Sequence, residues 1–315
     1  MHSVLGFVTC GAGSSNHRRL AHRPSNKKQD SNRRALCGEW ARYSPQQRAT
    51  QSRFAHSSTV ILHLASVRPV WQHRKMIEFR PLSDDHPDLA HSPMLRAALL
   101  TLRYAQEHGA IGLTKTKAFK RVFVHWAVEN FAWPGKSAEE MFRYSKVINE
   151  SEFPPLEVLH YLLITLRLGR HFKGEFRLTK RGAEIAHAPA QLFAELIPFF
   201  VLKIDHASYA RFDDRPFGKW DVWMNVINVE ANRGISERKL FAAFYGEEQD
   251  WDTAGWREMA AFSACVLRPL EWAGLIVETP DEQDGKQVHH VAKTPLWRSA
   301  LKLDTDQLLT PAPVN

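Results

Sequence analysis

The sequence is poor in cysteine and has no long apolar run. Its three cysteines, Cys10, Cys37 and Cys265, provide neither a disulfide framework nor the spacing of a zinc site. No apolar run approaches the ~18–20 residues that a membrane-spanning helix needs. We therefore expect a protein of the reducing cytoplasm that does not enter a membrane.

Common catalytic motifs are absent as well. There is no glycine-rich phosphate loop, no Gly-x-Ser-x-Gly and no His-Glu-x-x-His. Cys265 lies in the apolar run 264–267, where a thiol is a small core residue and not a nucleophile. These features predict a protein that is not an enzyme and that carries no cofactor.

The polar loop at 205–218 offers an alternative, a metal site. Asp205, His206 and the pair Asp213–Asp214 are oxygen and nitrogen donors, and functional sites often lie on loops. Two arginines in the same loop favour salt bridges instead. We therefore predict a loop that links two domains and holds no metal.

Acidic residues are almost missing from residues 1–75. This segment holds 13 lysines and arginines against Asp30 and Glu39, a net charge of +11, which leaves 29 basic and 32 acidic residues, or −3, for residues 76–315. The basic isoelectric point therefore belongs to the tail and not to the folded part. Since the segment is rich in Arg and Ser and has no sustained hydrophobic period, we predict a disordered basic tail over 1–75.

The tail has three interpretations. It is a basic arm for nucleic acid, a transit peptide, or upstream sequence translated from a start codon chosen too early. Met76 follows the tail, and globular patterning begins within twenty residues of it. We favour the third interpretation, in which the product in cells begins at Met76.

The folded part is organised around the stretch 154–182. Leucines recur there at steps of three and four residues, which is typical of one helix face, and a proline stands in the first turn. Beyond Gly169, apolar residues on either side of Lys173–Glu175 indicate two short strands around a tight turn, in which Gly174 adopts a positive φ. The hairpin residues expected to point into the core are Phe172, Phe176 and Leu178.

Three helices are predicted before this stretch. Ser92 is predicted to cap the first, and Thr114 to cap a second over 115–131 whose inner face includes Val122. Ser137 begins a capping box, in which a hydroxyl and a carboxylate satisfy each other's backbone amides at the start of the third helix.

An internal repeat is visible at a shift of 122 residues. Gly112–Phe123 aligns without a gap over Gly234–Tyr245, with a glycine, an aliphatic residue, a hydroxyl cap, a lysine and a phenylalanine in the same order. Residues 276–294 then have the pattern of strand, polar turn and strand, a second hairpin. The repeat indicates two copies of one module. Pro269 is expected to kink the central helix of the second copy and to keep it out of a DNA groove.

With helix, helix and hairpin in each copy, residues 92–303 resemble tandem winged helices. In that fold a helix enters the DNA major groove and the hairpin, or wing, lies beside it. Gly112–Thr116, the capped helix after it and Arg177–Gly182 make residues 110–185 similar to an uncharacterised bacterial group of plasmid and mobile-element reading frames. That likeness implies that the protein belongs to a plasmid or mobile element, and it implies no particular activity.

A chain of 315 residues is long enough for about two domains. The predicted fold class is mainly α with short β-hairpins, arranged as two winged-helix-like modules in tandem behind the basic tail. The predicted domains are the tail 1–75, a first module 76–204, a linking loop and helix 205–233, a second module 234–303 and a disordered C-terminus 304–315.

The two modules differ in charge. Residues 112–182 carry 13 basic and 7 acidic side chains, a net charge of +6, whereas residues 183–315 carry 13 basic and 20 acidic, a net charge of −7. Basic side chains near phosphates release condensed counterions, which supplies most sequence-independent affinity for DNA. We therefore predict that the first module binds duplex DNA. The predicted nucleic-acid-binding residues are Lys115, Lys117, Lys120, Arg121, Arg170, His171, Lys173, Arg177, Lys180 and Arg181.

The central helix itself is poorly equipped to read bases. Direct readout favours Arg, Lys, Asn or Gln. The candidate side chains on this helix are instead Glu157, His160, Tyr161 and Thr165. We therefore expect the wing to contact the phosphate backbone and the protein to read little sequence.

A protein–protein module is the alternative. The acidic second module carries Trp251, Trp256, Trp272 and Trp297, and tryptophan is enriched at protein interfaces as well as in cores. Under this interpretation neither wing binds DNA, and the second module binds a protein partner or a second copy of the chain. The sequence leaves both interpretations open.

Two measurements test the interpretation of the tail. Because composition and charge change sharply near Met76, we expect residues 1–75 to be digested rapidly by a protease and the native product to begin at Met76. Limited proteolysis and intact-mass analysis of the native protein check these outcomes. Protease resistance of the segment contradicts the first expectation, and a dominant full-length species contradicts the second.

Overall fold

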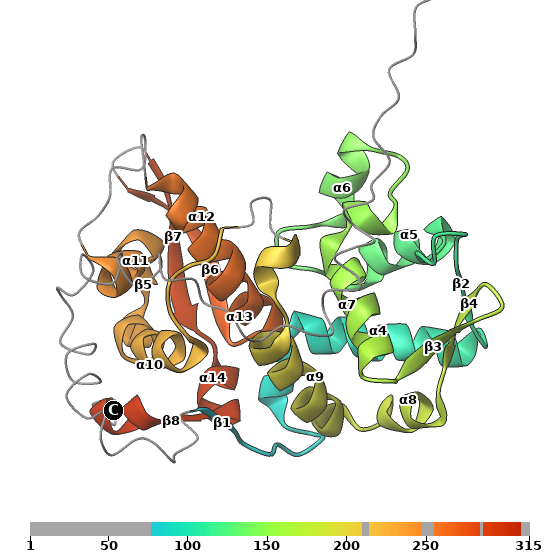
Figure 1. Cartoon of the computed structure of the whole chain (residues 1–315), viewed down its shortest axis with the longest axis horizontal. Coiled ribbons are helices and arrows are strands. Elements are labelled where there is room, and N and C mark those ends of the chain that lie inside the picture. The colour runs from blue at the N-terminus through green and yellow to red at the C-terminus, as the bar shows by residue number, and fades with distance from the viewer. Residues whose placement is uncertain (1–76, 210–213, 247–254, 284–285, 310–315) are drawn as a thin grey trace, which may run out of the picture. The chain divides into compact units, whose positions relative to one another are not determined.

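The computed structural model describes residues 77–209, 214–246, 255–283 and 286–309, all of which belong to one compact unit. The described part is mainly helical, with small antiparallel sheets (Figure 1). The predicted mainly helical class is therefore confirmed. The predicted tail, 1–75, lies outside the described residues.

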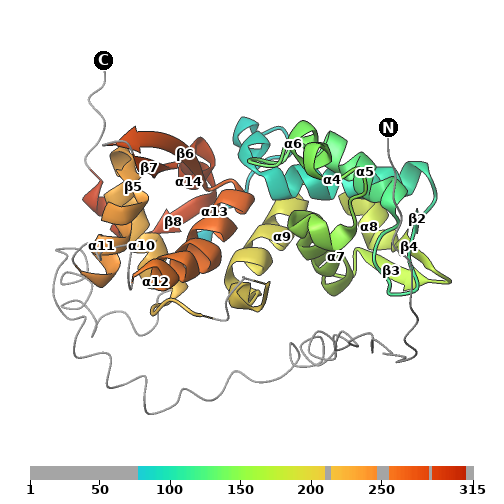
Figure 2. The same ribbon diagram turned by 90° about the horizontal axis from the view of Figure 1, so that it is seen from above.

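The first half of the described chain consists of helices around a three-stranded sheet with the strand order β2-β4-β3. In both views the hairpin of β3 and β4 extends beyond helix α7 (Figures 1 and 2). The elements of this half are β1 (Ile77–Phe79), the 3₁₀ turn η2 (Pro87–His91), α4 (Pro93–Glu107), β2 (Ile111–Gly112), α5 (Arg121–Asn130), α6 (Ala138–Tyr144), the 3₁₀ turn η3 (Glu150–Glu152), α7 (Pro154–Thr165), β3 (Gly169–Phe172), β4 (Glu175–Leu178), α8 (Lys180–Ile185) and α9 (Pro189–Lys203).

The second half repeats this succession of a helix, a strand, three helices and a hairpin. Its three-stranded sheet has the order β5-β7-β6, so the last strand again lies in the middle, and the two hairpins belong to separate sheets. These orders agree with the predicted repeat. The elements are the 3₁₀ turn η4 (His206–Tyr209), α10 (Trp220–Glu230), the 3₁₀ turn η5 (Ala231–Arg233), β5 (Ile235–Ser236), α11 (Glu237–Tyr245), α12 (Trp256–Phe262), the π-helical turn η6 (Ser263–Leu267), α13 (Arg268–Ala273), β6 (Ile276–Gln283), β7 (Lys286–Lys293), α14 (Pro295–Ala300), β8 (Leu301–Leu303) and the 3₁₀ turn η7 (Asp304–Leu308).

Helix α4 begins where the sequence predicts. The hydroxyl of Ser92 accepts a hydrogen bond from the backbone N–H of Leu95, and Pro93 occupies the first turn, where its missing N–H leaves no bond unmade. The capping box of Ser137 and Glu140 is also present at the start of α6. These local signals therefore determine the first turns of both helices.

The prediction for the second helix is wrong over its first residues. Helix α5 begins at Arg121 and not at Lys115, because Thr114 closes a loop instead of capping a helix. The Thr114 hydroxyl accepts a hydrogen bond from the backbone N–H of Ala118, and Lys117 has a positive φ of 66°. A positive φ is incompatible with a right-handed helix, so the chain must pass this loop before α5 can start.

The later start also changes which face of α5 is buried. Val122, predicted on the inner face, is 78% exposed. The buried residues of this helix are Phe123, Val124, Ala127 and Val128.

The proline in the long helix of the second half lies next to a π-helical turn. The backbone N–H of Arg268 bonds to the carbonyl of Ser263, five residues earlier, and Pro269 follows in the first turn of α13. The regular helical ladder is already interrupted at this point, so the missing N–H of Pro269 adds little further loss. The kink expected at Pro269 therefore takes the form of a π-helical turn.

Helix α10 is part of the second half rather than a linker. The sequence predicts a linking loop and helix over 205–233. In the structure the indole N–H of Trp223 donates to the hydroxyl of Tyr245 at 3.2 Å, and Asn225 Oδ1 accepts from the backbone N–H of Thr305 at 3.0 Å. α10 precedes β5 as α4 precedes β2, so α10 corresponds to α4 of the first half.

The C-terminal segment differs from the prediction of disorder over 304–315. β8 pairs with β1 in antiparallel register, Ile77 opposite Leu303, and η7 follows with Thr305 buried. The prediction is therefore wrong for 304–309, and 310–315 lies outside the described residues. Three-residue strands carry too little pattern to be found in a sequence.

The two halves meet where α13 ends. Gly274 adopts the left-handed conformation (φ 79°), and a Cβ atom there would lie 2.2 Å from the carbonyl oxygen of His91 and 2.5 Å from Ser92 Cα. Beside it the rings of Trp133 and Trp272 pack edge to face with centroids 5.3 Å apart. Glycine is required here for both its conformation and its lack of a side chain.

Gly274→Ala is therefore expected to destabilise the protein by about 2–4 kcal/mol, since it adds left-handed strain of about 1–2 kcal/mol and a backbone clash. Gly109→Ala is the matched control, because Gly109 also has a positive φ (74°) but nothing lies within 4 Å of its Cβ position. This control should be destabilised only by the left-handed strain, about 1–2 kcal/mol. Chemical denaturation of both variants measures the difference, and equal losses would refute the close approach.

Candidate nucleic-acid interface

The hairpin of the first half, residues 169–178, is here called the basic hairpin. A two-residue turn joins its strands, with φ 49° at Lys173 and φ 78° at Gly174. Positive φ at both central residues is the type I′ turn that suits the twist of a hairpin. The predicted positive φ of Gly174 is confirmed.

This turn fixes which residues lie opposite each other. Phe172 pairs with Glu175 and His171 with Phe176. His171 and Phe176, as partners, point to the same side of the hairpin. Since neighbouring residues of a strand point to opposite sides, Phe172 and Phe176 cannot point the same way. Phe176 is fully buried, whereas Phe172 is 40% exposed, so the inward position predicted for Phe172 is wrong.

The outer face of the basic hairpin gathers cations around an exposed aromatic ring. The charged groups of Arg170, Lys173 and Arg177 lie 5.5, 5.3 and 5.4 Å from the centroid of Phe172. At these distances each cation is attracted by the ring. The hairpin therefore presents three positive charges around one ring.

Two of these cations oppose each other directly. Arg170 and Arg177 are partners in the strand register, and like charges in that position repel. Glu175 offsets part of the repulsion through an ion pair with Arg177 at 2.8 Å, in which both groups are partly exposed. The face retains a net positive charge that an anion would stabilise.

Helix α7 presents few groups beside this face. Glu157, Tyr161 and Thr165 are exposed, as expected for candidate base readers. His160, the fourth candidate, is 7% exposed and faces the core, so it cannot reach a base. The exposed face of α7 thus offers one carboxylate and two hydroxyls.

His160 belongs to a polar chain that the sequence did not indicate, buried at Glu150 and His160 and exposed at His171. Its Nδ1 atom lies 2.7 Å from Glu150 Oε1, and its Nε2 atom lies 2.8 Å from Nε2 of His171 on β3. The other oxygen of Glu150 accepts the backbone N–H of Phe119. The three residues are here called the Glu150–His160–His171 chain. Glu150 is 31 positions from Phe119, and His160 is 11 positions from His171, so no local pattern could have placed them together.

The four predicted residues before α7 lie apart from the hairpin cations along the chain. Lys115 and Lys117 are exposed on the loop before α5, and Lys120 is the N-cap residue of that helix. Arg121 donates from Nε to the side-chain oxygen of Asn149 at 3.0 Å. The predicted helical cluster is therefore a basic loop followed by a helix start.

The last two predicted residues are not in the hairpin. Thr179 caps α8 by accepting the backbone N–H of Gly182, so Lys180 and Arg181 belong to that helix. Arg181 bonds to the carboxylate of Glu195, which raises the pKa of the guanidinium. Arg181 therefore holds α8 against α9.

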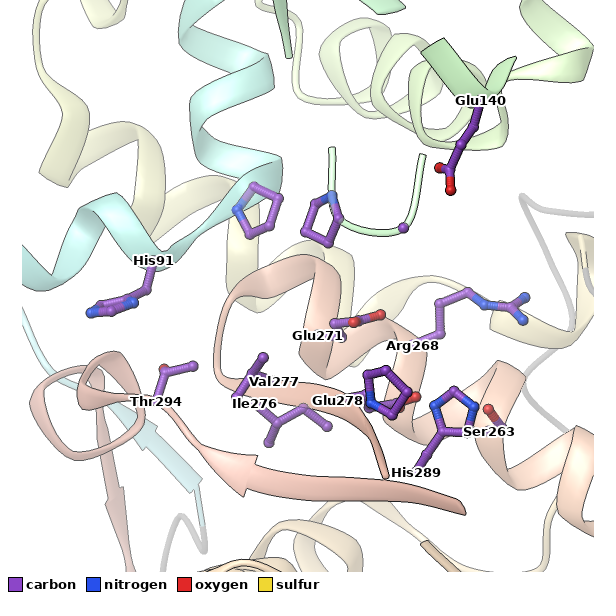
Figure 3. Close-up of a pocket in the computed structure, with 14 residues that line it drawn as sticks. His91, Glu140, Ser263, Arg268, Glu271, Ile276, Val277, Glu278, His289 and Thr294 are labelled. Atoms are coloured by element: carbon purple, nitrogen blue, oxygen red, sulfur yellow. The ribbon is translucent and has the colours of Figure 1, made fainter. Parts of the chain in front are cut away.

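A second candidate site is a cavity of about 740 Å³ beside the second hairpin (Figure 3). Burial raises the pKa of Glu278 to about 8, with the neighbouring carboxylates of Glu271 and Glu237 as further causes and Arg268 opposing. Glu278 Oε1 is buried without a hydrogen-bond partner. The side chain therefore holds its proton at neutral pH, and the cavity is less negative than its carboxyl groups suggest.

Lys293, the last residue of β7, is half-buried and donates hydrogen bonds to two asparagines. Its ammonium donates to the carbonyl and side-chain oxygens of Asn228 and to Asn232, and burial lowers its pKa to about 8.

The loop predicted to contain salt bridges contains them. Arg215 bonds to both oxygens of Asp205 at 2.7 and 2.6 Å, and Asp214 pairs with Arg257. Among the described residues, no three or more His, Cys, Asp or Glu side chains are arranged to hold a metal. Asp213 lies outside the described residues.

Burial raises the pKa of the Cys265 thiol to about 11, so this side chain stays protonated in the core. Within the described part of the chain, none of the helices has the length and apolar character to cross a bilayer.

The raised pKa of Glu278 predicts that the stability of the protein depends on pH. Glu278 titrates near its ordinary pKa when unfolded and near 8 when folded, so the unfolded state loses its proton first and stability falls as the pH rises from about 4.5 to 8. Glu278→Gln should therefore gain about 1–3 kcal/mol over the parent at pH 8 and little at pH 4.5. Thermal denaturation against pH measures this gain, with exposed Glu258→Gln as control. A gain that does not depend on pH would refute the shift.

Comparisons with known proteins place the chain in a family. The model of the Y4jL N-terminal domain matches residues 90–191, and that of the y4jL C-terminal domain matches residues 210–295. The "Uncharacterized protein y4jL" of Sinorhizobium fredii (strain NBRC 101917 / NGR234) is 36% identical over 160 residues, which cover 50% of this chain and 73% of the relative. No solved structure matches the chain. The two consecutive domain matches and the coverage of this relative show that the chain belongs to the bacterial y4jL family.

Proposed function

We propose that the protein binds duplex DNA and that each half is a winged helix. The order of elements supports this fold, because a helix, a strand, three helices and a hairpin recur with the last strand in the middle of a three-stranded sheet. In such a module the hairpin lies over the DNA backbone beside the helix that faces the groove. Here these parts are the basic hairpin and α7.

The observation that carries the proposal is the group of three cations around Phe172. Arg170 and Arg177 repel each other across the strands, and phosphate oxygens between them would turn this repulsion into charge-assisted hydrogen bonds. Arginine forks suit phosphate in particular. A polyanion is therefore the ligand that this face fits best.

Contacts to the backbone fit better than contacts to bases. The exposed side chains of α7 include Glu157, which repels phosphate, and none of the amide or guanidinium groups that form bidentate pairs with bases. The basic loop with Lys115 and Lys117 adds exposed charge that reads no sequence. We therefore expect broad affinity for duplex DNA.

The second half differs from the first in a way that favours a protein partner. Trp272 and Trp297 belong to the core, while Trp256 is 44% exposed at the start of α12, and Trp251 lies outside the described residues. An exposed tryptophan on an acidic module suits a protein interface. We therefore include in the proposal that the second half binds a protein partner or a second copy of the chain. The proposed location is the bacterial cytoplasm, and the proposed setting is a plasmid or mobile element.

The test removes the three hairpin cations together. Arg170→Gln, Lys173→Gln and Arg177→Gln in one chain should weaken binding to all duplex sequences alike and lower the slope of log affinity against log salt by about one unit for each phosphate interaction removed. Since the side chains are exposed, stability should change by about 0.5 kcal/mol or less for each substitution. Fluorescence anisotropy at several salt concentrations, with and without residues 1–75, measures the affinity and its salt slope.

A matched control removes three cations from the second half. Lys219, Arg233 and Lys239 are exposed there, and their exchange for Gln gives the same change of net charge. Lys293 is unsuitable because it holds Asn228 and Asn232. Equal affinity of the hairpin variant and the parent would favour the protein–protein function, and a loss confined to one DNA sequence would mean that the hairpin reads bases.

A further inference from the structure

The Glu150–His160–His171 chain joins the three segments of the proposed DNA surface. Glu150 accepts the backbone N–H of Phe119 at the end of the basic loop, His160 lies on α7, and His171 lies on β3 of the basic hairpin. Each segment reaches the same buried carboxylate, either directly or through the ring of His160. The chain therefore ties together elements that are far apart in sequence.

The chemistry of the chain assigns its protons. An ionised carboxylate only accepts hydrogen bonds, so His160 must carry a proton on Nδ1. In the neutral ring Nε2 is then an acceptor, and His171 has to donate its Nε2–H to it. With His160 neutral, the interaction requires a donor at position 171 but no positive charge there.

A metal between the two imidazoles does not fit. Their Nε2 atoms are 2.8 Å apart, the length of a hydrogen bond, whereas two nitrogens on tetrahedral zinc are separated by about 3.3 Å given bonds of about 2.0–2.1 Å. The site also has no third protein ligand among the described residues. The contact is thus a hydrogen bond.

We propose that the Glu150–His160–His171 chain is a positioning device, which holds the basic loop and the basic hairpin in one arrangement against α7. The inference rests on the proposed binding of DNA. His171 then acts by anchoring β3 and not as a cation on phosphate. The side chain of His171 is exposed, but it lies on the same face of the hairpin as its partner Phe176 and reaches Nε2 of His160, which agrees with this role.

The chain gains rigidity from its surroundings. The ring of His160 stacks on Phe119 with centroids 3.9 Å apart, and Phe176 packs against both rings. Glu150 and His160 are almost fully buried, with side chains 4% and 9% exposed, so water competes little for their hydrogen bonds. Removal of the donor at position 171 would leave a buried acceptor unsatisfied.

The test compares two variants of the full chain, His171→Gln, which keeps a donor, and His171→Leu, which does not. Amide exchange at Phe119, measured without DNA, should accelerate at least threefold in His171→Leu and stay at the parental rate in His171→Gln. Affinity for duplex DNA should fall about three- to tenfold in His171→Leu, the worth of one hydrogen bond, with the salt slope unchanged. Arg170→Gln is the control, since it should lower the slope by about one unit without altering exchange at Phe119.

Each result decides the matter. A lower salt slope in both His171 variants would make His171 a phosphate contact and overturn the proposal, as would parental affinity and exchange in His171→Leu. If the parent does not bind DNA but exchange at Phe119 responds as expected, the positioning role stands and the proposed function fails. If His171→Leu unfolds, His171→Gln alone still decides, because reduced affinity in a variant that keeps the donor would refute the role.

Discussion

The register of the basic hairpin depends on its two-residue turn. With Lys173 and Gly174 as the only connecting residues, His171 must lie opposite Phe176 and Arg170 opposite Arg177. One more residue in the turn would exchange the two faces, since side chains alternate along a strand. Gly169 strengthens the constraint, because a Cβ atom there would lie 2.0 Å from the ring of Phe176. The turn and the packing of one ring thus decide that the cations face outward and His171 inward.

The sequence predicted features that depend on neighbouring residues and missed those that depend on distant ones. Caps at Ser92 and Ser137 involve groups three residues apart, and both were found. The start of α5 was misplaced because Thr114 can cap a helix or close a loop, and the bridge between Leu113 and Phe119 decides for the loop. Local sequence patterns cannot weigh that longer-range pairing.

The sequence predicted which residues belong to the candidate site but not how they are arranged. All ten predicted residues are exposed, and three of them gather around Phe172. The inward position of Phe172 was wrong because the turn was taken to include Glu175, a shift of one residue that reverses the face. The Glu150–His160–His171 chain was missed because it forms only when η3, α7 and β3 come together.

The two halves use the same order of elements with opposite electrostatics. The first half buries one carboxylate, Glu150, which hydrogen bonds satisfy on both oxygens, and so can leave its hairpin cations at the surface. The second half buries Lys293 among amide oxygens and crowds Glu271 and Glu278 beside its hairpin, where burial keeps Glu278 protonated. In the second half, therefore, the ammonium of Lys293 serves internal contacts and Glu278 carries no charge at neutral pH.

Arg170 and Arg177 show why this difference matters for function. Like charges placed opposite each other destabilise a hairpin, so the pair is a cost to the isolated fold. The inward anchors, Phe176 and the hydrogen bond of His171, keep the strands paired despite that cost. An anion bound between the two guanidinium groups would remove this repulsion. In the proposed binding of DNA, the fold holds these cations together before a phosphate backbone arrives, so that binding would have less to order.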